Sequence, residues 1–183
     1  PNDGTGHGAS DSARSQDSID GSDARTLEPN LRQAADLCTD LGQLLNTNEL
    51  PDALKRAAEL LHASGIILWV RDETGVALRP AAGHGYSPDM LLKIGTISCD
   101  GDNVTIEAYR SGQLQVVSGT TDETGAIAAP LLAPSGCIGV MSAEIFEANV
   151  MSEILQATTL ILAAQLSTLV SADPVAETGR AQA

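Results

Sequence analysis

The spacing of apolar residues divides this chain into helical and extended stretches. Apolar positions recur every three or four residues after Asn30, over about 49–63 and over about 150–171, and this spacing predicts three long helices. Runs rich in branched apolar residues lie between these helices and have the length of strands. They predict strands at 66–70, 76–82, 113–117 and, as a hairpin, within 126–146.

Capping and breaking residues set the expected limits of the first two helices. Asn30 is expected to cap the first helix, which ends near Asn46. Pro51 fits the second helix because it lies in the first turn, and Ser64-Gly65 is expected to end it. The apolar stripe of the first helix consists of Leu31, Ala34 or Ala35, Cys38, Leu41 and Leu45.

The middle of the chain reads as loops and two short helices. Gly83-His84-Gly85-Tyr86 is predicted to be a flexible link, and Ser87 to begin a short helix with proline at its first position. Residues 94–102 follow no regular pattern. Asp102 is expected to cap the next helix, which Gly112 ends.

The order of these elements is α, α, β, β, α, α, β, β, β, α. Strands and helices do not alternate regularly, so we expect an α+β fold with an antiparallel sheet of five to six strands flanked by helices. The predicted domain is 28–172. Residues 1–27, rich in Ser, Gly and Asp, are expected to form a disordered linker, because they bury too little apolar surface to offset ordering. Residues 173–183 are expected to be a disordered tail.

Composition limits the partners of the chain. A formal net charge of −14 opposes binding to nucleic acid and to anionic membranes, so neither is expected as a partner. No apolar run without polar interruption reaches the roughly 18–20 residues of a membrane span. Aromatic residues make up only 2%, so the core must be aliphatic. Cys38, Cys99 and Cys137 are odd in number and far apart, which indicates a reducing cytoplasm.

Several short patterns, taken in order, resemble those of a GAF domain. The resemblance covers about 31–170 and implies a GAF-like (profilin-like or PAS-like) fold, with the N- and C-terminal helices packed together on one face. It also implies a regulatory role more often than a catalytic one. The matching pieces are Leu50–Leu61, Gly65–Val70, Ala108–Gln113, Pro130-Leu131, Ser135-Gly136 and Gly139-Val140.

The resemblance also implies where a small molecule would bind. In GAF domains a ligand, when present, lies between the sheet and the helices that follow the second strand, which here is the segment 84–109. The alternative is that the same side chains are ordinary core and loop residues. The candidate ligand-binding residues are His84, Tyr86, Met90, Ile97, Cys99, Val104 and Tyr109, with Ile106 beside them.

This chain lacks the residues that bind the better-known ligands of GAF domains. Cyclic-nucleotide binders carry a spaced set that includes Phe, whereas Phe146 lies on the final strand. Bilin binders have Cys next to His, whereas Cys99 is followed by Asp100. His84 is the one candidate for a haem ligand, and a histidine between glycines more often faces solvent. The cofactor is therefore unknown.

The family that this chain resembles includes an enzyme, free methionine-R-sulfoxide reductase, which uses cysteine thiolates around the pocket. Cys99 lies in the corresponding region, but the acids Asp100 and Asp102 should raise the pKa of its thiol. Neither Cys38, on the apolar stripe of the first helix, nor Cys137, in the last hairpin, is positioned as a resolving cysteine for Cys99. No catalytic motif or metal-ligand pattern is present, so we predict no enzyme, no catalytic residue and no metal.

The terminal helices are candidates for self-association. A stripe as wide as that of the last helix can pack on the sheet and also meet a partner, and the GAF domains that this chain resembles often dimerise by bundling their terminal helices, so a homodimer is expected. The alternative is that both helices only cover the back of the sheet. The prediction is a small-molecule-sensing and dimerisation module of a larger cytoplasmic signalling protein of bacterial type; a degenerate GAF domain that only dimerises is the alternative. The stripe of the last helix consists of Met151, Ile154, Leu155, Thr158, Leu162, Gln165, Leu166 and Leu169, widened by Ile161 and Val170.

Overall fold

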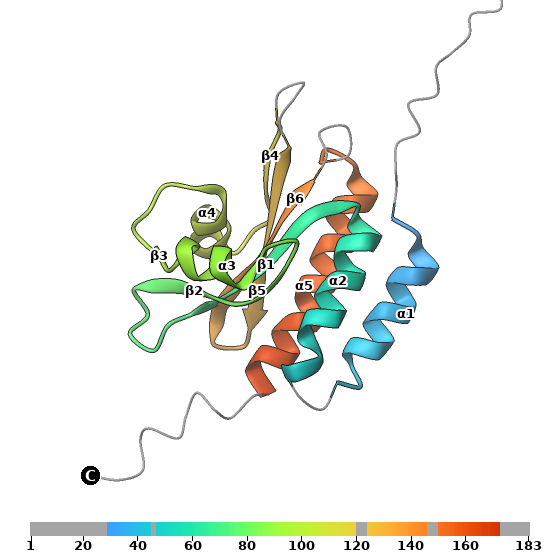
Figure 1. The fold of residues 1–183 in the computed structure, drawn as a ribbon, viewed down its shortest axis with the longest axis horizontal. Coiled ribbons are helices and arrows are strands. Elements are labelled where there is room, and N and C mark those ends of the chain that lie inside the picture. The colour runs from blue at the N-terminus through green and yellow to red at the C-terminus, as the bar shows by residue number, and fades with distance from the viewer. Residues whose placement is uncertain (1–28, 45–46, 120–123, 146–149, 173–183) are drawn as a thin grey trace, which may run out of the picture.

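A six-stranded antiparallel sheet organises the molecule (Figure 1). The computed structural model describes residues 29–44, 47–119, 124–145 and 150–172. The predicted linker (1–27) and tail (173–183) lie outside the described residues. The strand order is β3-β2-β1-β6-β5-β4, so the first and last strands, β1 and β6, pair with each other in the centre of the sheet. The strands are β1 (Ala63–Arg71), β2 (Ala77–His84), β3 (Ile97–Ser98), β4 (Gln115–Val117), β5 (Gly125–Ala133) and β6 (Gly136–Ile145).

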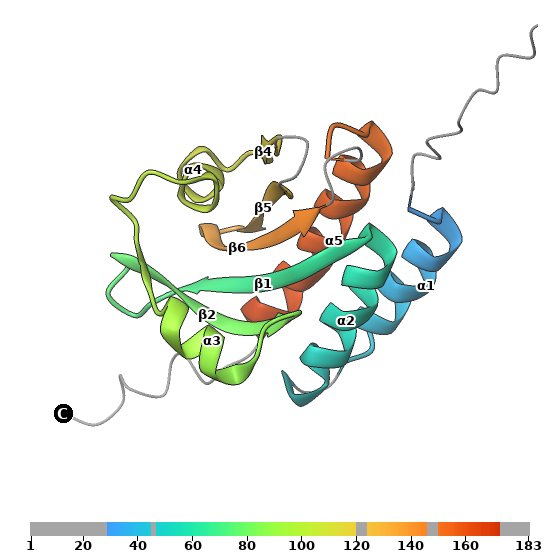
Figure 2. The same cartoon turned by 45° about the horizontal axis from the view of Figure 1, so that its top comes forward.

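Helices cover both faces of the sheet. Figures 1 and 2 show α1, α2 and α5 together on one side of the sheet and α3 and α4 on the other. The first helix contacts both α2 and α5, so the two terminal helices lie side by side. The helices are α1 (Leu31–Leu41), α2 (Leu50–Leu61), α3 (Pro88–Ile94), α4 (Val104–Ser111) and α5 (Glu153–Ala172), with a 3₁₀ turn at Thr47–Glu49.

The predicted caps begin two of these helices. The Asn30 side chain accepts hydrogen bonds from the backbone N–H groups of Arg32 and Gln33, and the Ser87 hydroxyl accepts one from Met90. These bonds satisfy backbone donors that have no partner inside the helix. The capping residue of α4 is Asn103 and not the predicted Asp102, because the Asn103 side chain reaches the N–H of Ile106.

The predicted end of the first helix was wrong. The helix α1 ends at Leu41 with Gly42 as its cap, one turn before the predicted limit. Its buried stripe is Ala34, Leu37 and Leu41, whereas Leu31 is 66% exposed. Leu37 takes the place of Leu31 on the buried face, and the predicted stripe residue Leu45 lies outside the described residues.

Three boundaries in the sheet also differ from the prediction. Ser64-Gly65 lies inside β1, because His62 adopts a left-handed conformation and ends α2 earlier. Gly83 and His84 belong to β2, where they pair with Ile67 and Ile66. The strand β3 was not predicted, and it forms where Ile97 and Ser98 pair with the first residues of β2.

The sheet separates two apolar clusters. Even-numbered residues of β1, such as Ile66 and Leu68, face α1, α2 and α5, and odd-numbered residues, Ile67 and Trp69, face α3 and α4. The strand is buried from residue 65 to residue 70, as its unbroken apolar run predicts. We call the second set the α4-side cluster. Its buried members are Ile67, Trp69, Leu78, Ile106, Ala108, Ala128 and Val140.

The last helix has a buried face and an exposed face. Over Glu153–Ser171, α5 is long and apolar enough to cross a membrane by length and composition alone. Leu155, Leu162 and Leu166 are buried within the cluster on the α1, α2 and α5 side, as in a helix that belongs to a domain core. The buried Thr159 hydroxyl donates to the carbonyl of Leu155 at 2.8 Å, which satisfies it inside the core.

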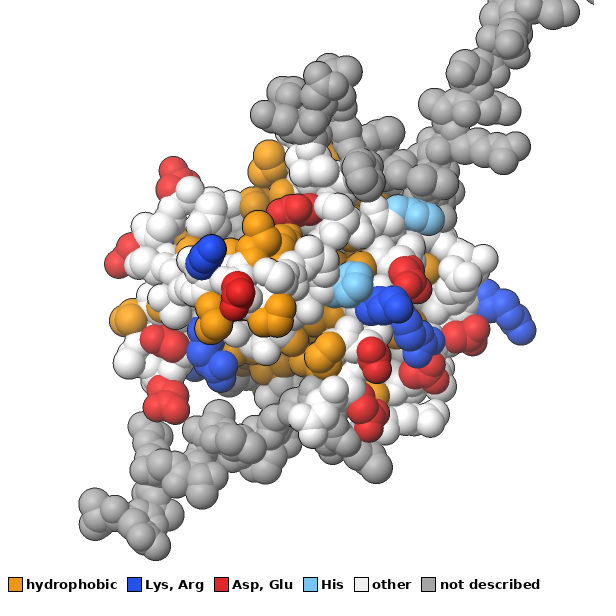
Figure 3. Space-filling view, in the orientation of Figure 1, with side chains coloured by type: hydrophobic (Ala, Val, Ile, Leu, Met, Phe, Trp, Pro, Cys, Tyr) orange, Lys and Arg blue, Asp and Glu red, His pale blue; other side chains and the backbone are white. Residues whose placement is uncertain are grey.

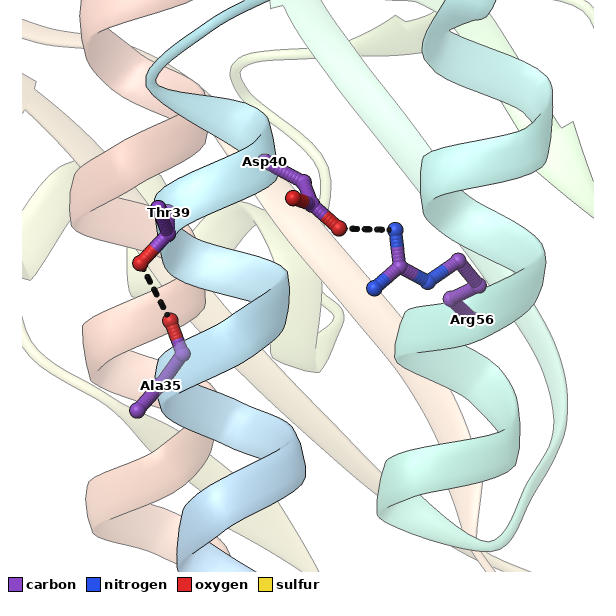
Figure 4. Close-up of polar contacts among 4 residues, drawn as sticks. All are labelled: Ala35, Thr39, Asp40 and Arg56. Carbon is purple, nitrogen blue, oxygen red and sulfur yellow. Dashed lines mark hydrogen bonds and ion pairs between the residues drawn. The ribbon is translucent and has the colours of Figure 1, made fainter.

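A salt bridge joins the first two helices at the surface. Figure 4 shows Asp40 of α1 and Arg56 of α2 pointing toward one another, with 2.6 Å between Arg56 Nη1 and Asp40 Oδ2. Both side chains are about half exposed, so the pair adds little to stability. Apolar side chains of α1, namely Ala34, Leu37 and Leu41, pack in the same cluster as residues of α2 and α5.

Candidate functional site

Side chains of the protein itself occupy the region where a ligand was predicted to bind. Five of the candidate residues pack against the α4-side cluster and are partly buried. Ile106 lies within the cluster and is fully buried. The five are Tyr86, Ile97, Cys99, Val104 and Tyr109.

Two other candidates stand apart from this cluster. His84 is half-buried in β2 and is not one of the residues packed on the cluster. Met90 is 52% exposed on α3, a helix that buries none of its residues. Figure 3 shows hydrophobic side chains at the surface over α3, and Leu92 there is 79% exposed.

Trp69 is the largest side chain of the α4-side cluster, and sequence reasoning did not include it among the site residues. It is 3% exposed, and its indole Nε1 donates a hydrogen bond to Ser142 Oγ at 2.8 Å. A buried tryptophan needs such a partner for its N–H group. The signal was present in the sequence, because alternation along 66–70 places residues 67 and 69 on the same face.

Tyr86 closes one end of this region. Its ring lies over Gly65, where an added Cβ would come within 2.6 Å of the ring. Burial, together with a hydrogen bond to the Glu144 carboxylate and the charge of that carboxylate, raises the pKa of the Tyr86 hydroxyl well above its usual range. The contact ties the β2–α3 connection to β6.

This pKa shift predicts a loss of stability in alkaline solution. A tyrosine whose pKa is raised by folding stabilises the folded state below the unfolded pKa of about 10, and that stabilisation is lost as the pH rises further. The free energy of unfolding in urea should therefore decline between pH 9 and 11, and less so in Tyr86→Phe. Tyr109→Phe should keep the wild-type decline, because it leaves Tyr86 in place. An equal decline in wild type and Tyr86→Phe would contradict the assignment.

The three cysteines lie in different parts of the structure. Cys38 is on α1, Cys99 follows β3 and Cys137 is on β6, and all three are half-buried free thiols. Burial raises the pKa of each thiol, and for Cys99 the charges of Asp72 and Asp100 raise it further. The described ranges also contain no group of three or more His, Cys, Asp or Glu residues arranged to hold a metal.

Two surface hollows of the described residues lie away from the predicted ligand region, and each has a volume of about 420 Å³. One is a polar hollow between the end of α1 and the start of α2, around Asp40 and Arg56. The other, which we call the α5 groove, is bounded by α5, β5 and the turn after α4. Its lining residues are Gly112, Gln113, Leu114, Pro130, Leu132, Leu160 and Ala164.

The outer face of α5 carries a regular stripe of uncharged residues. Within the helix, Glu153 is the one charged residue among 20. The exposed positions follow one another at spacings of three and four, as in a helix that pairs with another helix. We call this set the α5 stripe. It consists of Ile154, Ala157, Ile161, Ala164 and Thr168, with Leu160 at its edge.

No protein-family model and no curated sequence matches this chain. Its architecture, a six-stranded antiparallel sheet between α1, α2 and α5 on one side and α3 and α4 on the other, is that of a GAF domain. The fold predicted from the sequence is therefore confirmed.

Particular solved structures show the likeness. The chain is similar to the GAF domain of a phosphoenolpyruvate-protein phosphotransferase from Coxiella burnetii, with 14% identity and a TM-score of 0.67 over 82% of this chain and 95% of that one. The corresponding domain from Acinetobacter gives 13% identity and a TM-score of 0.66 over 77% and 92%. Free methionine-R-sulfoxide reductase from Neisseria meningitidis gives 17% and 0.62 over 74% and 84%. At these identities the shared property is the fold.

Proposed function

We propose that this chain is a regulatory module that self-associates through α5, within a larger cytoplasmic signalling protein. The α5 stripe is the observation that carries this proposal. Two of the similar structures are GAF domains of phosphoenolpyruvate-protein phosphotransferases, which supports a role as one part of a larger protein. The free, half-buried cysteines support a reducing compartment.

The spacing of the stripe favours a helical partner. Exposed apolar and small residues repeated at three and four place one continuous seam along the helix, and such a seam packs against another helix. Ile161 is 50% exposed and Ile154 is 37% exposed, so water contacts large branched side chains in the absence of a partner. The small side chains of Ala157 and Ala164 permit a partner helix to approach α5 closely.

The charge of the chain opposes self-association over most of its surface but not along α5. With a net charge of −14, two copies repel each other over most of their surfaces. That repulsion is weakest where α5 presents its uncharged face. A basic partner would instead be drawn to the acidic surface, and an anionic membrane would be repelled.

Ile161→Glu should convert the full-length chain from dimer to monomer. The substitution places a carboxylate in the middle of the stripe, and pairing would then bury two like charges against each other. Sedimentation velocity across a concentration series measures the change. The matched control is Leu92→Glu, because Leu92 is 79% exposed on α3, on the other face of the sheet.

The oligomeric states of wild type and of the two variants decide whether the chain associates through α5. A wild-type dimer that only Ile161→Glu dissociates supports association through α5. A wild-type chain that remains monomeric at every concentration rules the proposal out. Far-UV circular dichroism of both variants establishes that the fold is retained.

A small-molecule sensor is the second candidate, and the setting of α3 favours it. This helix buries none of its residues, and Gly85 and Gly95 at its two ends have φ values of 86° and 65°. Only a few contacts, such as that of Leu91 with the α4-side cluster, hold it over the sheet. Displacement of α3 would uncover the part of the α4-side cluster on which Leu91 packs. Native mass spectrometry tests this idea: a non-covalent extra mass that disappears on denaturation supports a sensor, and bare chains favour a purely structural module.

Thiol chemistry has less support. The Neisseria structure shows that the fold accommodates a methionine sulfoxide reductase. In this chain, however, burial raises the pKa of Cys38, Cys99 and Cys137, and a raised pKa lowers the thiolate fraction that such chemistry needs.

A further inference from the structure

The α5 groove adjoins the α5 stripe and shares residues with it. Leu160 and Ala164 belong to both, so a molecule that covers the stripe also reaches the groove. The opposite wall comes from elements distant in the sequence, namely Leu132 of β5 and the turn from Gly112 to Leu114. The surface available to a partner therefore extends beyond the terminal helices.

The groove is apolar and has no charged side chain in its lining. Leu132 is 53% exposed and Leu160 is 43% exposed, although both are large aliphatic residues. The turn residue Gly112 adds no bulk to the floor: its φ is 64°, and the nearest atom to an added Cβ would be a Leu132 methyl at 3.8 Å. Exposure of such a surface to water is unfavourable, and an aliphatic side chain of a partner would cover it well.

We propose that this groove receives α5 of a second copy, with Ile161 of that copy seated between Leu132 and Leu160. The inference rests on the proposed function and adds a strand residue, Leu132, to the surface through which the copies meet. Near the two-fold axis of a symmetric dimer, a side chain meets the surroundings of its own equivalent. Ile161 satisfies this condition because it is next to Leu160 and three residues from Ala164, and it is half exposed near the middle of α5.

The size and charge of the groove favour this occupant. Its volume of about 420 Å³ exceeds that of one branched side chain, and its open shape admits the ridge of a helix. The partner must also tolerate an acidic chain, and α5 of a second copy presents one charged residue, Glu153, in 20. An aliphatic ridge without charge therefore matches an aliphatic groove without charge.

Leu132→Glu in the full-length chain tests the inference. We expect self-association to weaken at least about tenfold in sedimentation equilibrium, because the carboxylate would be buried against Ile161 of the second copy. Leu132→Met should associate like wild type, and Leu92→Glu should do the same, since both leave the groove apolar. Leu132 and Leu92 both lie at the surface of the single chain, so far-UV circular dichroism should show the native fold in all three variants.

The outcomes distinguish this inference from the proposed function. If Ile161→Glu dissociates the dimer and Leu132→Glu does not, the groove is not part of the interface and the inference fails alone. If wild type is monomeric, both fail. An equal weakening in Leu92→Glu would assign the effect to added charge and would also overturn the inference.

A direct contact provides a second test that does not depend on stability. In dimers mixed from isotope-labelled and unlabelled copies, filtered nuclear Overhauser spectra should connect Leu132 methyl groups to Ile161 methyl groups of the other copy. Contacts from Leu132 to a co-purified small molecule, or none across copies, would overturn the proposal.

Discussion

Gly139→Ala should destabilise the domain by about 3 kcal/mol or more, because a methyl group has no room at this position. Gly139 is in β6, beside the central strand β1. An added Cβ would lie 2.2 Å from the carbonyl oxygen of Trp69, and backbone on an inner strand cannot move aside as a flexible side chain does. The strain would fall on the ladder in which Gly139 pairs with Val70.

Thermal and urea unfolding followed by circular dichroism measure this effect. For a domain of this size the unfolding midpoint should fall by roughly 10 °C. Gly42→Ala is the matched control: Gly42 has a φ of −67°, and the nearest atoms to its added Cβ are at 3.5 Å and 3.6 Å. It should change stability by no more than about 0.5 kcal/mol. An unchanged midpoint in Gly139→Ala would mean that β1 and β6 do not approach so closely.

Trp69→Ala should cost about 3–5 kcal/mol, since it removes the largest side chain of the α4-side cluster. The indole is 3% exposed and has a hydrogen-bond partner in Ser142, so no solvent contact compensates for its loss. Trp69→Phe keeps most of the apolar volume and should cost less than half as much. Urea unfolding gives both values, with far-UV circular dichroism as the probe because the variants lack the only tryptophan.

The same variant tests whether the ligand region is closed by its own side chains. If Trp69 fills that space, Trp69→Ala opens an apolar cavity, and added indole should bind there and raise the unfolding midpoint. Indole should leave the midpoint of wild type unchanged. If indole stabilises neither protein, the surrounding helices collapse into the space instead; if it stabilises wild type, the region is open before mutation.

Much of the fold was predictable because local signals and tertiary packing agree. The apolar run 66–70 predicts a strand buried on both faces, and β1 has this property. Ser87-Pro88 predicts the start of α3, and the Ser87 hydroxyl makes the expected bond. In such places the short-range chemistry alone determines the element.

The differences arise where pairing partners decide the conformation. His84 was expected in a flexible link because it lies between glycines, but pairing with Ile66 extends β2 to include it. The strand β3 is only two residues long and has no periodicity of its own, so only its partners Ala77 and Leu78 reveal it. Sequence spacing contains neither fact.

The sequence predicted on which side of the sheet the candidate residues lie, but not which contacts they make there. The resemblance to a GAF domain placed Tyr86, Ile97 and Val104 between the sheet and the helices after the second strand, and in the structure they pack on one cluster on that side of the sheet. The face of Trp69 follows from the alternation along 66–70, but its hydrogen bond to Ser142 could not be inferred, because it depends on how β6 pairs with β1. The α5 groove could not be inferred either, since it joins α5 to Leu132 and to the turn at Gly112, which are far apart along the chain.

The two outer strands of the sheet, β3 and β4, have a consequence for proteins that contain this domain in several copies. They are two and three residues long, and the parts of β2 and β5 that they leave uncovered contain Pro80 and Pro130, which have no N–H group to donate to a foreign strand. Edge-to-edge addition, the first step toward fibrous aggregates, therefore has little template on either side. Crowded copies of the domain therefore have little route to irreversible strand-by-strand aggregation.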